Sequence, residues 1–323
     1  MPRSALVAPA SLKGVLAARD AAAAVAAGLA EAGVESEQCP VADGGEGTAD
    51  AVASVLGGAW HVATVADPLG RPVAAWWLEL PGGTAVVEAA AALGLGLVAP
   101  GERDPLRASS RGLGELILAA LEAAGVRRLL VCLGGSATVD GGRGLREVVS
   151  SLPEGTRVAC DVASPLLDAA RLFARQKGAD DAAVVELERR LAADEALAPY
   201  AELPGAGAAG GLGAALASLG AELVPGAALV LDTLDFDGRL EGAELVVTGE
   251  GTVDRTTREG KAPAEVVRRA AAHGVECVVF GGVVVEPLPE TETIALSGDP
   301  TRAADDLREL GLRLGARLVD AAR

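Results

Sequence analysis

The sequence predicts an α/β protein that has a doubly wound sheet and a second domain with a different strand pattern. Short apolar strands alternate with helical segments at both ends of the chain, and Gly-rich turns follow the strands. From Trp60 to Glu88 the pattern changes, because three strand-like runs follow one another without a helix between them. The 323 residues are enough for two domains or one large α/β unit.

The elements before residue 90 follow from apolar runs and the turns that separate them. Strands are expected over residues 5–9 and 39–42, with an amphipathic helix over 17–32 and another beginning at Thr48. An antiparallel meander is expected over residues 60–66, 73–80 and 84–88, whose connections read Pro-Leu-Gly and Pro-Gly-Gly.

The rest of the chain returns to alternating helices and strands. The expected strands cover residues 129–133, 157–160, 245–248 and 276–280. The expected helices cover residues 112–124, 182–197 and 263–273, and a closing helix begins near Thr301. The helix over 182–197 is rich in Ala, Glu and Arg, so we expect a solvated surface element. The Gly- and Ala-rich stretch 204–216 reads as a linker.

Composition and charge exclude several classes of function. The formal net charge is −17 and no Lys/Arg cluster interrupts it, so we expect no nucleic-acid partner. The four cysteines are scattered and form no Cys-x-x-Cys pair, which predicts neither a zinc site nor a disulfide framework. No signal peptide or membrane-spanning stretch is apparent, so we expect a cytoplasmic protein without a membrane partner. The sequence carries no signal for an oligomeric state.

The first two Gly-rich turns place charged side chains directly after strands, where ligands bind in open α/β sheets. Residues 8–14 read Ala-Pro-Ala-Ser-Leu-Lys-Gly, so Ser11 and Lys13 can hold a phosphate or carboxylate, or the segment only begins a helix. Residues 41–48 contain Asp43, Gly44, Gly45 and Glu46, whose carboxylates can face Mg²⁺ or a sugar hydroxyl. A tight turn with helix-capping acids is the alternative.

A third turn, residues 133–142, reads Leu-Gly-Gly-Ser-Ala-Thr-Val-Asp-Gly-Gly and is the strongest motif by spacing. It offers backbone N–H groups, two hydroxyls and one carboxylate in a single loop, as phosphoryl transfer requires. Its candidate residues are Gly134, Gly135, Ser136, Thr138 and Asp140.

A fourth turn, residues 247–254, presents Glu250 and Asp254 and is followed by Lys261. The two carboxylates can serve as metal ligand or base, and the ammonium can neutralise developing phosphate charge. Asp161 stands directly after another strand and adds one more carboxylate. With only two histidines, catalysis by histidine and His-based metal sites are not expected.

Taken in this order, the motifs resemble those of the type-1 glycerate kinase family along nearly the whole chain. The matching segments are residues 11–14, 40–48, 68–72, 134–138 with 140–142, 159–162, 176–178, 204–213, 248–251 with Asp254, and 260–263. The stretch 204–213, read above as a linker, is a family signature by this resemblance.

The resemblance implies a flavodoxin-like parallel-sheet domain with a second mixed α/β domain inserted into it, and an active site in the cleft between them. We expect residues 1–58 and 233–323 to form the first domain and 59–232 the inserted one. The implied reaction is transfer of the ATP γ-phosphate, with Mg²⁺, to a hydroxyl of D-glycerate or a similar small hydroxy acid. A dinucleotide-dependent oxidoreductase is a further possibility, but the chain has no G-x-G-x-x-G motif after its first strand.

We combine these motifs into one set of predicted site residues. The predicted catalytic residues are Lys13, Asp43, Asp140 and Asp254. The predicted substrate- and ATP-binding residues are Ser11, Gly44, Gly45, Glu46, Gly134, Gly135, Ser136, Thr138 and Lys261. Asp161 and Glu250 are the predicted Mg²⁺ ligands. The sequence does not separate the base from the metal ligands.

This chain departs from the family at five positions near the predicted site. Ala10, Leu12, Val139, Thr252 and Thr256 stand where the family usually has Asp, an aromatic residue, Asn, Arg and Gln. The chain is also shorter than the family over residues 144–157 and around 167–171. These departures motivate the alternative of a catalytically impaired homologue that still binds nucleotide or an anion in a regulatory role.

Overall fold

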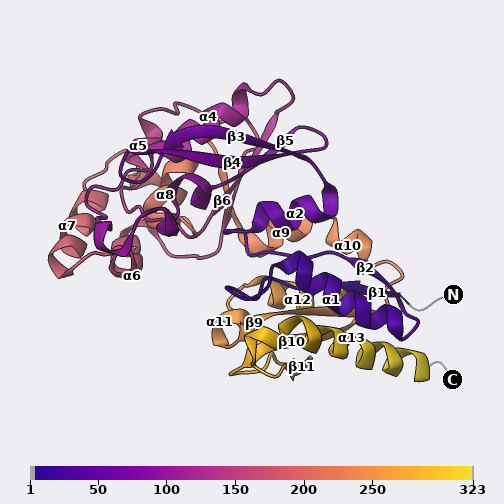
Figure 1. Ribbon diagram of the computed structural model, residues 1–323. Coiled ribbons are helices and arrows are strands. Elements are labelled where there is room, and N and C mark those ends of the chain that lie inside the picture. Colours follow the sequence, from indigo (N-terminus) through magenta and orange to yellow (C-terminus); the bar gives the residue numbers. More distant parts are fainter. Residues whose placement is uncertain (1–3, 322–323) are drawn as a thin grey trace. The chain divides into compact units, whose positions relative to one another are not determined.

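The structure is a computed structural model that describes residues 4–321, and these residues form two compact units (Figure 1). Residues 4–43, 50–56 and 227–321 belong to the first unit, and residues 44–49 and 57–226 belong to the second. The second unit is therefore inserted between parts of the first along the chain. The expected domain boundaries at residues 58/59 and 232/233 stay a proposal.

The first unit is built on a parallel sheet of five strands in the order β11-β10-β9-β1-β2. Its strands are β1 (Ser4–Val7), β2 (Glu35–Gln38), β9 (Leu245–Val253), β10 (Glu276–Val284) and β11 (Glu292–Ala295). Numbered along this unit alone, the strand order is 2-1-3-4-5, which is the flavodoxin-like order. The predicted flavodoxin-like sheet is thus confirmed.

Helices cover both faces of the first sheet because its central strands β1, β9 and β10 are largely apolar on both faces. Val247 and Phe280 pack in the cluster that α1 (Ala18–Glu31) and α13 (Ala303–Asp320) complete. Val279 points to the opposite face, where it packs near Val267 of α12 (Ala262–Ala272). The shorter helices along this part of the chain are α2 (Thr48–Leu56), α9 (Gly226–Thr233), α10 (Phe236–Arg239) and α11 (Arg255–Arg258).

The second unit contains a mixed sheet of six strands in chain order. Its strands are β3 (Ala59–Ala66), β4 (Pro72–Leu80), β5 (Thr84–Glu88), β6 (Arg128–Leu133), β7 (Arg157–Cys160) and β8 (Glu222–Pro225). β3, β4 and β5 pair antiparallel, as the meander prediction required, whereas β5 to β8 pair parallel. The predicted mixed α/β character of this part is confirmed.

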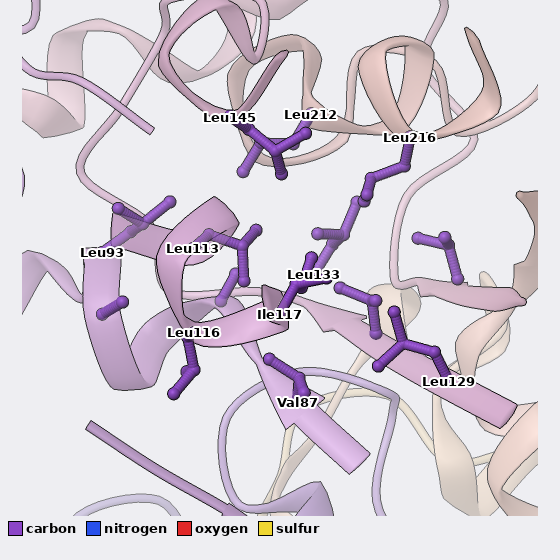
Figure 2. Packing of buried hydrophobic residues seen from close by; sticks show 14 of the residues in the cluster. Val87, Leu93, Leu113, Leu116, Ile117, Leu129, Leu133, Leu145, Leu212 and Leu216 are labelled. Atoms are coloured by element: carbon purple, nitrogen blue, oxygen red, sulfur yellow. The ribbon is translucent and has the colours of Figure 1, made fainter. Parts of the chain in front are cut away.

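The core of the second unit consists mainly of aliphatic side chains, with Trp77 packed among them, in a chain with 2% aromatic residues. Figure 2 shows Leu113, Leu116 and Ile117 of α4 (Arg111–Glu122) close to Val87 and Leu133 of the sheet. Leu212 and Leu216 of α8 (Ala208–Ser218) complete the cluster. The other helices of this unit are α3 (Ala89–Leu93), α5 (Arg143–Arg146), α6 (Ala169–Phe173) and α7 (Asp181–Ala192).

The interpretation of residues 204–216 as a linker is wrong, because most of this stretch belongs to the buried helix α8. Its glycines are required by close packing. A Cβ on Gly210 would lie 2.1 Å from the carbonyl oxygen of Thr138, and Gly210 has a positive φ of 77°. The Gly-rich composition therefore permits contact between backbones.

Other element boundaries also differ from the expectation. The second strand is Glu35–Gln38 rather than 39–42, because its ladder with β1 ends at the Val7–Gln38 pair. Beyond this pair, the backbone N–H groups of Cys39 and Val41 each donate one further backbone hydrogen bond. α7 ends at Ala192, and its Val184, Leu187 and Leu191 are buried, so it is not a fully solvated helix. The edge strands β8 and β11 were not predicted.

All four cysteines are free thiols; Cys277 is half-buried and the other three are buried. Burial raises the pKa of the Cys39 and Cys160 thiols to about 12, so both stay protonated near neutral pH. Within residues 4–321, no helix has the length and apolarity needed to cross a bilayer.

The close contact between α1 and α13 should make the free energy of unfolding sensitive to the size of the side chain at residue 28. A Cβ on Gly28 would lie 2.0 Å from the carbonyl oxygen of Arg308, so Gly28→Ala forces the two helices apart. We expect the free energy of unfolding to fall by about 1–3 kcal/mol, although alanine normally stabilises a helix relative to glycine. Urea titration followed by circular dichroism measures the change.

The matched control is Gly101→Ala, because nothing lies within 4 Å of a Cβ added at Gly101. This variant should unfold within about 0.5 kcal/mol of the wild type. A Gly28→Ala protein as stable as the control would contradict the packing of α1 against α13.

Candidate functional site

The first unit has a cavity of about 300 Å³ at the carboxyl ends of its strands. Its walls come from the loop after β1, the end of β9, β10 and the segment that leads into α13. β1 and β9 are neighbours in the sheet, and the helices α1 and α12 that follow them cover opposite faces. This is the topological switch point at which doubly wound sheets bind their ligands.

The loop after β1 is a tight turn that presents Ser11 and Lys13 to this cavity. The backbone N–H groups of Leu12 and Leu16 each donate a hydrogen bond to the other residue's carbonyl oxygen, and both distances are 2.9 Å. The Leu12 side chain is buried in the core of the unit, whereas Lys13 is exposed at the turn. The fixed turn therefore holds a cation at the mouth of the cavity.

Glu250 and Lys261 form an ion pair on the wall of the same cavity. The Lys261 Nζ lies 3.3 Å from Glu250 Oε2, and the Thr257 hydroxyl donates to Glu250 Oε1 at 2.7 Å. Burial raises the pKa of Glu250 above its usual range, and the negative charge of Asp43 adds to that shift, while Thr257 and Lys261 oppose it. The site is thus electrostatically favourable for a cation.

Asp43 and Asp254 each hold the start of a helix. Asp43 Oδ1 accepts a bond of 2.9 Å from the backbone N–H of Ala262, in the first turn of α12. Asp254 caps α11, where its Oδ1 accepts from the N–H and the hydroxyl of Thr256, and these bonds lower the pKa of Asp254. Both carboxylates are positioned by helix N–H groups, and their predicted catalytic roles stay predictions.

The second unit has its own cavity, of about 510 Å³, at the carboxyl ends of β5, β6 and β7. Gly134, Gly135 and Ser136 line it directly after β6, and Asp161 lines it directly after β7. The remaining lining residues are Glu46, Ala90, Gly94 to Leu97, Val162, Phe173, Gln176, Lys177 and Ala209. Four predicted binding residues and one predicted metal ligand thus meet in one place.

Residues 44–46 are packed against the loop that follows β6. A Cβ on Gly134 would lie 2.7 Å from the Cα of Gly45, so the two glycine backbones are in contact. A Cβ on Gly44 would lie 2.6 Å from the Ala159 Cβ. These contacts require glycine at 44 and 134 and direct Glu46 toward the cavity.

Asp140 organises the loop rather than lining the cavity wall. Its Oδ2 accepts from the N–H and hydroxyl of Ser110 at 2.9 and 2.8 Å and from the N–H of Gly144 at 3.1 Å. Its Oδ1 accepts from the N–H of Gly142 at 3.1 Å. Four donors account for the position of this carboxylate, and its predicted role as a base stays a prediction.

Lys177 is the side chain that the sequence prediction missed. Only 4% of it is exposed, and its Nζ donates to the Ser136 hydroxyl at 3.1 Å and to the Thr138 carbonyl oxygen at 2.8 Å. Burial lowers its pKa to about 7, although the charges of Asp140 and Asp161 oppose this shift. The Gln-Lys-Gly motif at 176–178 was the available signal, but it follows no strand, and its spacing gave no reason to place it beside residues 134–138.

The structure thus distributes the predicted residues over two cavities. Ser11, Lys13, Glu250 and Lys261 line that of the first unit, with Asp43 and Asp254 at the nearby helix starts. Glu46, Gly134, Gly135, Ser136 and Asp161 line that of the second, with Gly44, Gly45, Thr138 and Asp140 supporting it. The Thr138 side chain is fully buried, so its direct contact with a ligand stays a prediction.

The sequence matches a known protein family along most of its length. The model of the glycerate kinase family matches residues 5–151 and 150–298. The chain belongs to the glycerate kinase family. The two matches meet at residues 150–151, inside the segment 144–157 in which the resemblance predicted a shortening.

Relatives in this family cover most of the chain. The glycerate 2-kinase of Escherichia coli (strain K12) is 38% identical, over 87% of this chain and 85% of its own length. The glycerate kinase of Bacillus subtilis (strain 168) is 37% identical, over 86% and 85%. A crystal structure of a proposed glycerate kinase 2 from Salmonella typhimurium LT2 has a TM-score of 0.87 at 31% identity, with both chains fully covered.

Three of the five departures from the glycerate kinase pattern fill the hydrophobic core. Ala10, Leu12 and Val139 are all buried, and Leu12 and Val139 belong to apolar clusters. Thr252 lines the cavity of the first unit, and Thr256 bonds the capping carboxylate of Asp254. Packing thus accounts for Ala10, Leu12 and Val139 and a local hydrogen bond for Thr256, whereas Thr252 remains at the cavity wall.

The buried ammonium of Lys177 predicts a pH-dependent stability. Unfolded lysine binds its proton up to a pKa of about 10.5, whereas folded Lys177 releases it near pH 7, so the unfolded state binds more protons between these values. The contribution of Lys177 to the free energy of unfolding is therefore least favourable below pH 7 and rises as the pH rises toward 10.

We expect the difference in unfolding free energy between wild type and Lys177→Met to rise with pH over this window by a few kcal/mol, since one pKa unit corresponds to about 1.4 kcal/mol. Urea titrations at pH 6, 7, 8, 9 and 10 measure it, and Lys13→Met is the control for removing a lysine. A difference that falls or stays flat with pH would contradict the burial of a charged Lys177.

Proposed function

We propose that this chain is an ATP-dependent kinase that phosphorylates a hydroxyl of D-glycerate, or of a similar small hydroxy acid, with Mg²⁺. The observation that carries the proposal is the family match along the chain, together with relatives named glycerate kinase at 36–38% identity. The two cavities at the carboxyl ends of parallel strands support it, because a kinase of this kind must hold two anionic ligands.

The placement of the lysines also supports the proposal. Only three of the 28 lysine and arginine residues are lysines. Lys13 and Lys261 line the cavity of the first unit, and Lys177 lines that of the second. A lysine ammonium is a compact point charge suited to phosphate and carboxylate oxygens.

We place the nucleotide in the cavity of the first unit. It lies at the switch point of a flavodoxin-like sheet, and two lysines can meet phosphate charge there. Val15, Val283 and Leu296 form apolar wall that can pack against a base. Lys13 and Lys261 then neutralise the charge that develops on the transferred group.

Mg²⁺ fits the carboxylates of the first unit. The negative charge of Asp43 contributes to the raised pKa of Glu250, and a bound cation would relieve that repulsion. Within residues 4–321, no three His, Cys, Asp or Glu side chains form a metal cage. Mg²⁺ commonly binds through one or two carboxylates and the phosphates of its nucleotide, so these residues fit the ion, which would offset phosphate charge.

The reaction forms a bond between the acceptor hydroxyl oxygen and the γ-phosphorus and breaks the bond from that phosphorus to the β–γ bridging oxygen, so ADP leaves. The hydroxyl proton passes to a carboxylate. Glu46 and Asp161 line the cavity of the second unit and are the carboxylates that can accept it there. We place this chemistry in the cytoplasm, in keeping with four free cysteines.

Coupled measurement of ADP release tests the proposal. The wild type should form ADP with Mg²⁺–ATP and D-glycerate, and chelation of Mg²⁺ should abolish it. Lys13→Met should lower kcat/KM by about 100-fold, because one positioned donor to the reacting phosphates is lost.

Arg19→Met is the matched control, since Arg19 is an exposed cation at the start of α1 and does not line the cavity. It should keep kcat/KM within about twofold of the wild type. Tight ADP binding without turnover of any hydroxy acid would overturn the proposal and favour a catalytically impaired homologue.

A further inference from the structure

Lys177 lies at the wall of the second cavity as a cation almost completely shielded from bulk water. Its exposed fraction is 4%, yet it lines the cavity of about 510 Å³. The part of its side chain that remains accessible therefore faces this cavity. A buried ammonium is costly unless a nearby anion and hydrogen-bond acceptors compensate for the lost hydration.

The protein supplies only part of that compensation. An ammonium has three N–H donors, and the bonds to the Ser136 hydroxyl and the Thr138 carbonyl oxygen use two of them. The charges of Asp140 and Asp161 act on Lys177, but burial still prevails and holds its pKa near 7. An anion that reaches Lys177 would therefore gain from the third donor of the ammonium.

We infer that Lys177 is the group that receives the carboxylate of the hydroxy-acid substrate, at the wall of the cavity formed by β5, β6 and β7. This inference rests on the proposed function and adds to it the place and the partner of the acid. Lys177 is then a substrate-binding residue that selects acceptors carrying a negative charge.

The other charges of the cavity favour a small hydroxy acid over a triphosphate. Glu46 and Asp161 line the same cavity as Lys177, so one cation accompanies two carboxylates. A triphosphate would bring several negative charges against both carboxylates. A hydroxy acid brings a single carboxylate for Lys177 and hydroxyl donors that Glu46 and Asp161 can accept.

A purely structural role for Lys177 makes a different prediction. Its bonds to Ser136 and Thr138 hold the loop that lines the cavity, so a lysine that only fixes this loop would affect every acceptor alike. A lysine that also binds the carboxylate would affect charged acceptors far more than neutral ones. Comparing a charged with a neutral acceptor therefore separates the two roles.

The experiment measures kcat/KM for D-glycerate and for its neutral amide, D-glyceramide, in wild type and in Lys177→Met. We expect the wild type to prefer the acid by about 100-fold or more, because the third donor of the buried ammonium has no carboxylate to bind when the amide replaces the acid. In Lys177→Met this preference should collapse to within a few-fold, because kcat/KM falls far more for the acid than for the neutral acceptor. Lys177→Arg should restore part of the preference.

The matched control is Lys13→Met, which removes a lysine from the other cavity. It should lower kcat/KM for both acceptors equally and keep the preference for the acid. An equal loss for both acceptors in Lys177→Met, or a lost preference in Lys13→Met, would overturn the inference.

Titration calorimetry with D-glycerate alone separates failure of this inference from failure of the proposed function. A wild type that forms no ADP but binds D-glycerate, with binding lost in Lys177→Met, would overturn the kinase proposal and support the inference. A wild type that turns over D-glycerate with the same affinity in Lys177→Met would overturn the inference alone.

Discussion

Parallel pairing of strands is the constraint on which the candidate sites depend. In a parallel sheet all carboxyl ends lie at one edge, so loops far apart in the sequence meet there. In the first unit this pairing joins β1, β9 and β10, and it brings Lys13 and Glu250 to one cavity although 237 positions separate them. In the second unit the parallel run from β5 to β7 does the same for Gly134 and Asp161.

Much of the fold could be predicted because strand and helix periods were clear. The change of pattern at Trp60 marked the antiparallel meander, and the Gly-rich turns marked the strand ends. The stretch 204–216 was misread because glycine serves both flexible linkers and close backbone contacts. Only the structure shows that Gly210 packs against the carbonyl of Thr138. The short edge strands β8 and β11 have little alternation and gave no signal.

The candidate site was predictable as a set of loops but not as a set of roles. Asp140 and Asp254 stood out by sequence because both are acids among glycines and hydroxyls, yet each accepts backbone N–H bonds that organise its own loop. Lys177 gave a weak signal because its importance comes from burial, which depends on partners 39 and 41 positions away. Spacing alone could not distinguish a carboxylate that shapes a turn from one that meets a ligand.

Lysine and arginine occupy different kinds of position in this chain. Its exposed ion pairs are made almost entirely by arginine, as in the contacts of Arg189 with Glu186 and Arg268 with Glu265. The three lysines instead line the two cavities. We assign Lys13 and Lys261 to the nucleotide and Lys177 to the acid.

Carbon-13 NMR of protein labelled at the ε-carbon of lysine tests this assignment most directly, since the chain gives three resonances that single lysine-to-arginine variants identify. A non-hydrolysable ATP analogue should shift the Lys13 and Lys261 resonances, whereas D-glycerate should shift that of Lys177. The assignment is wrong if D-glycerate leaves the Lys177 resonance unchanged, or if the nucleotide analogue shifts the Lys177 resonance alone.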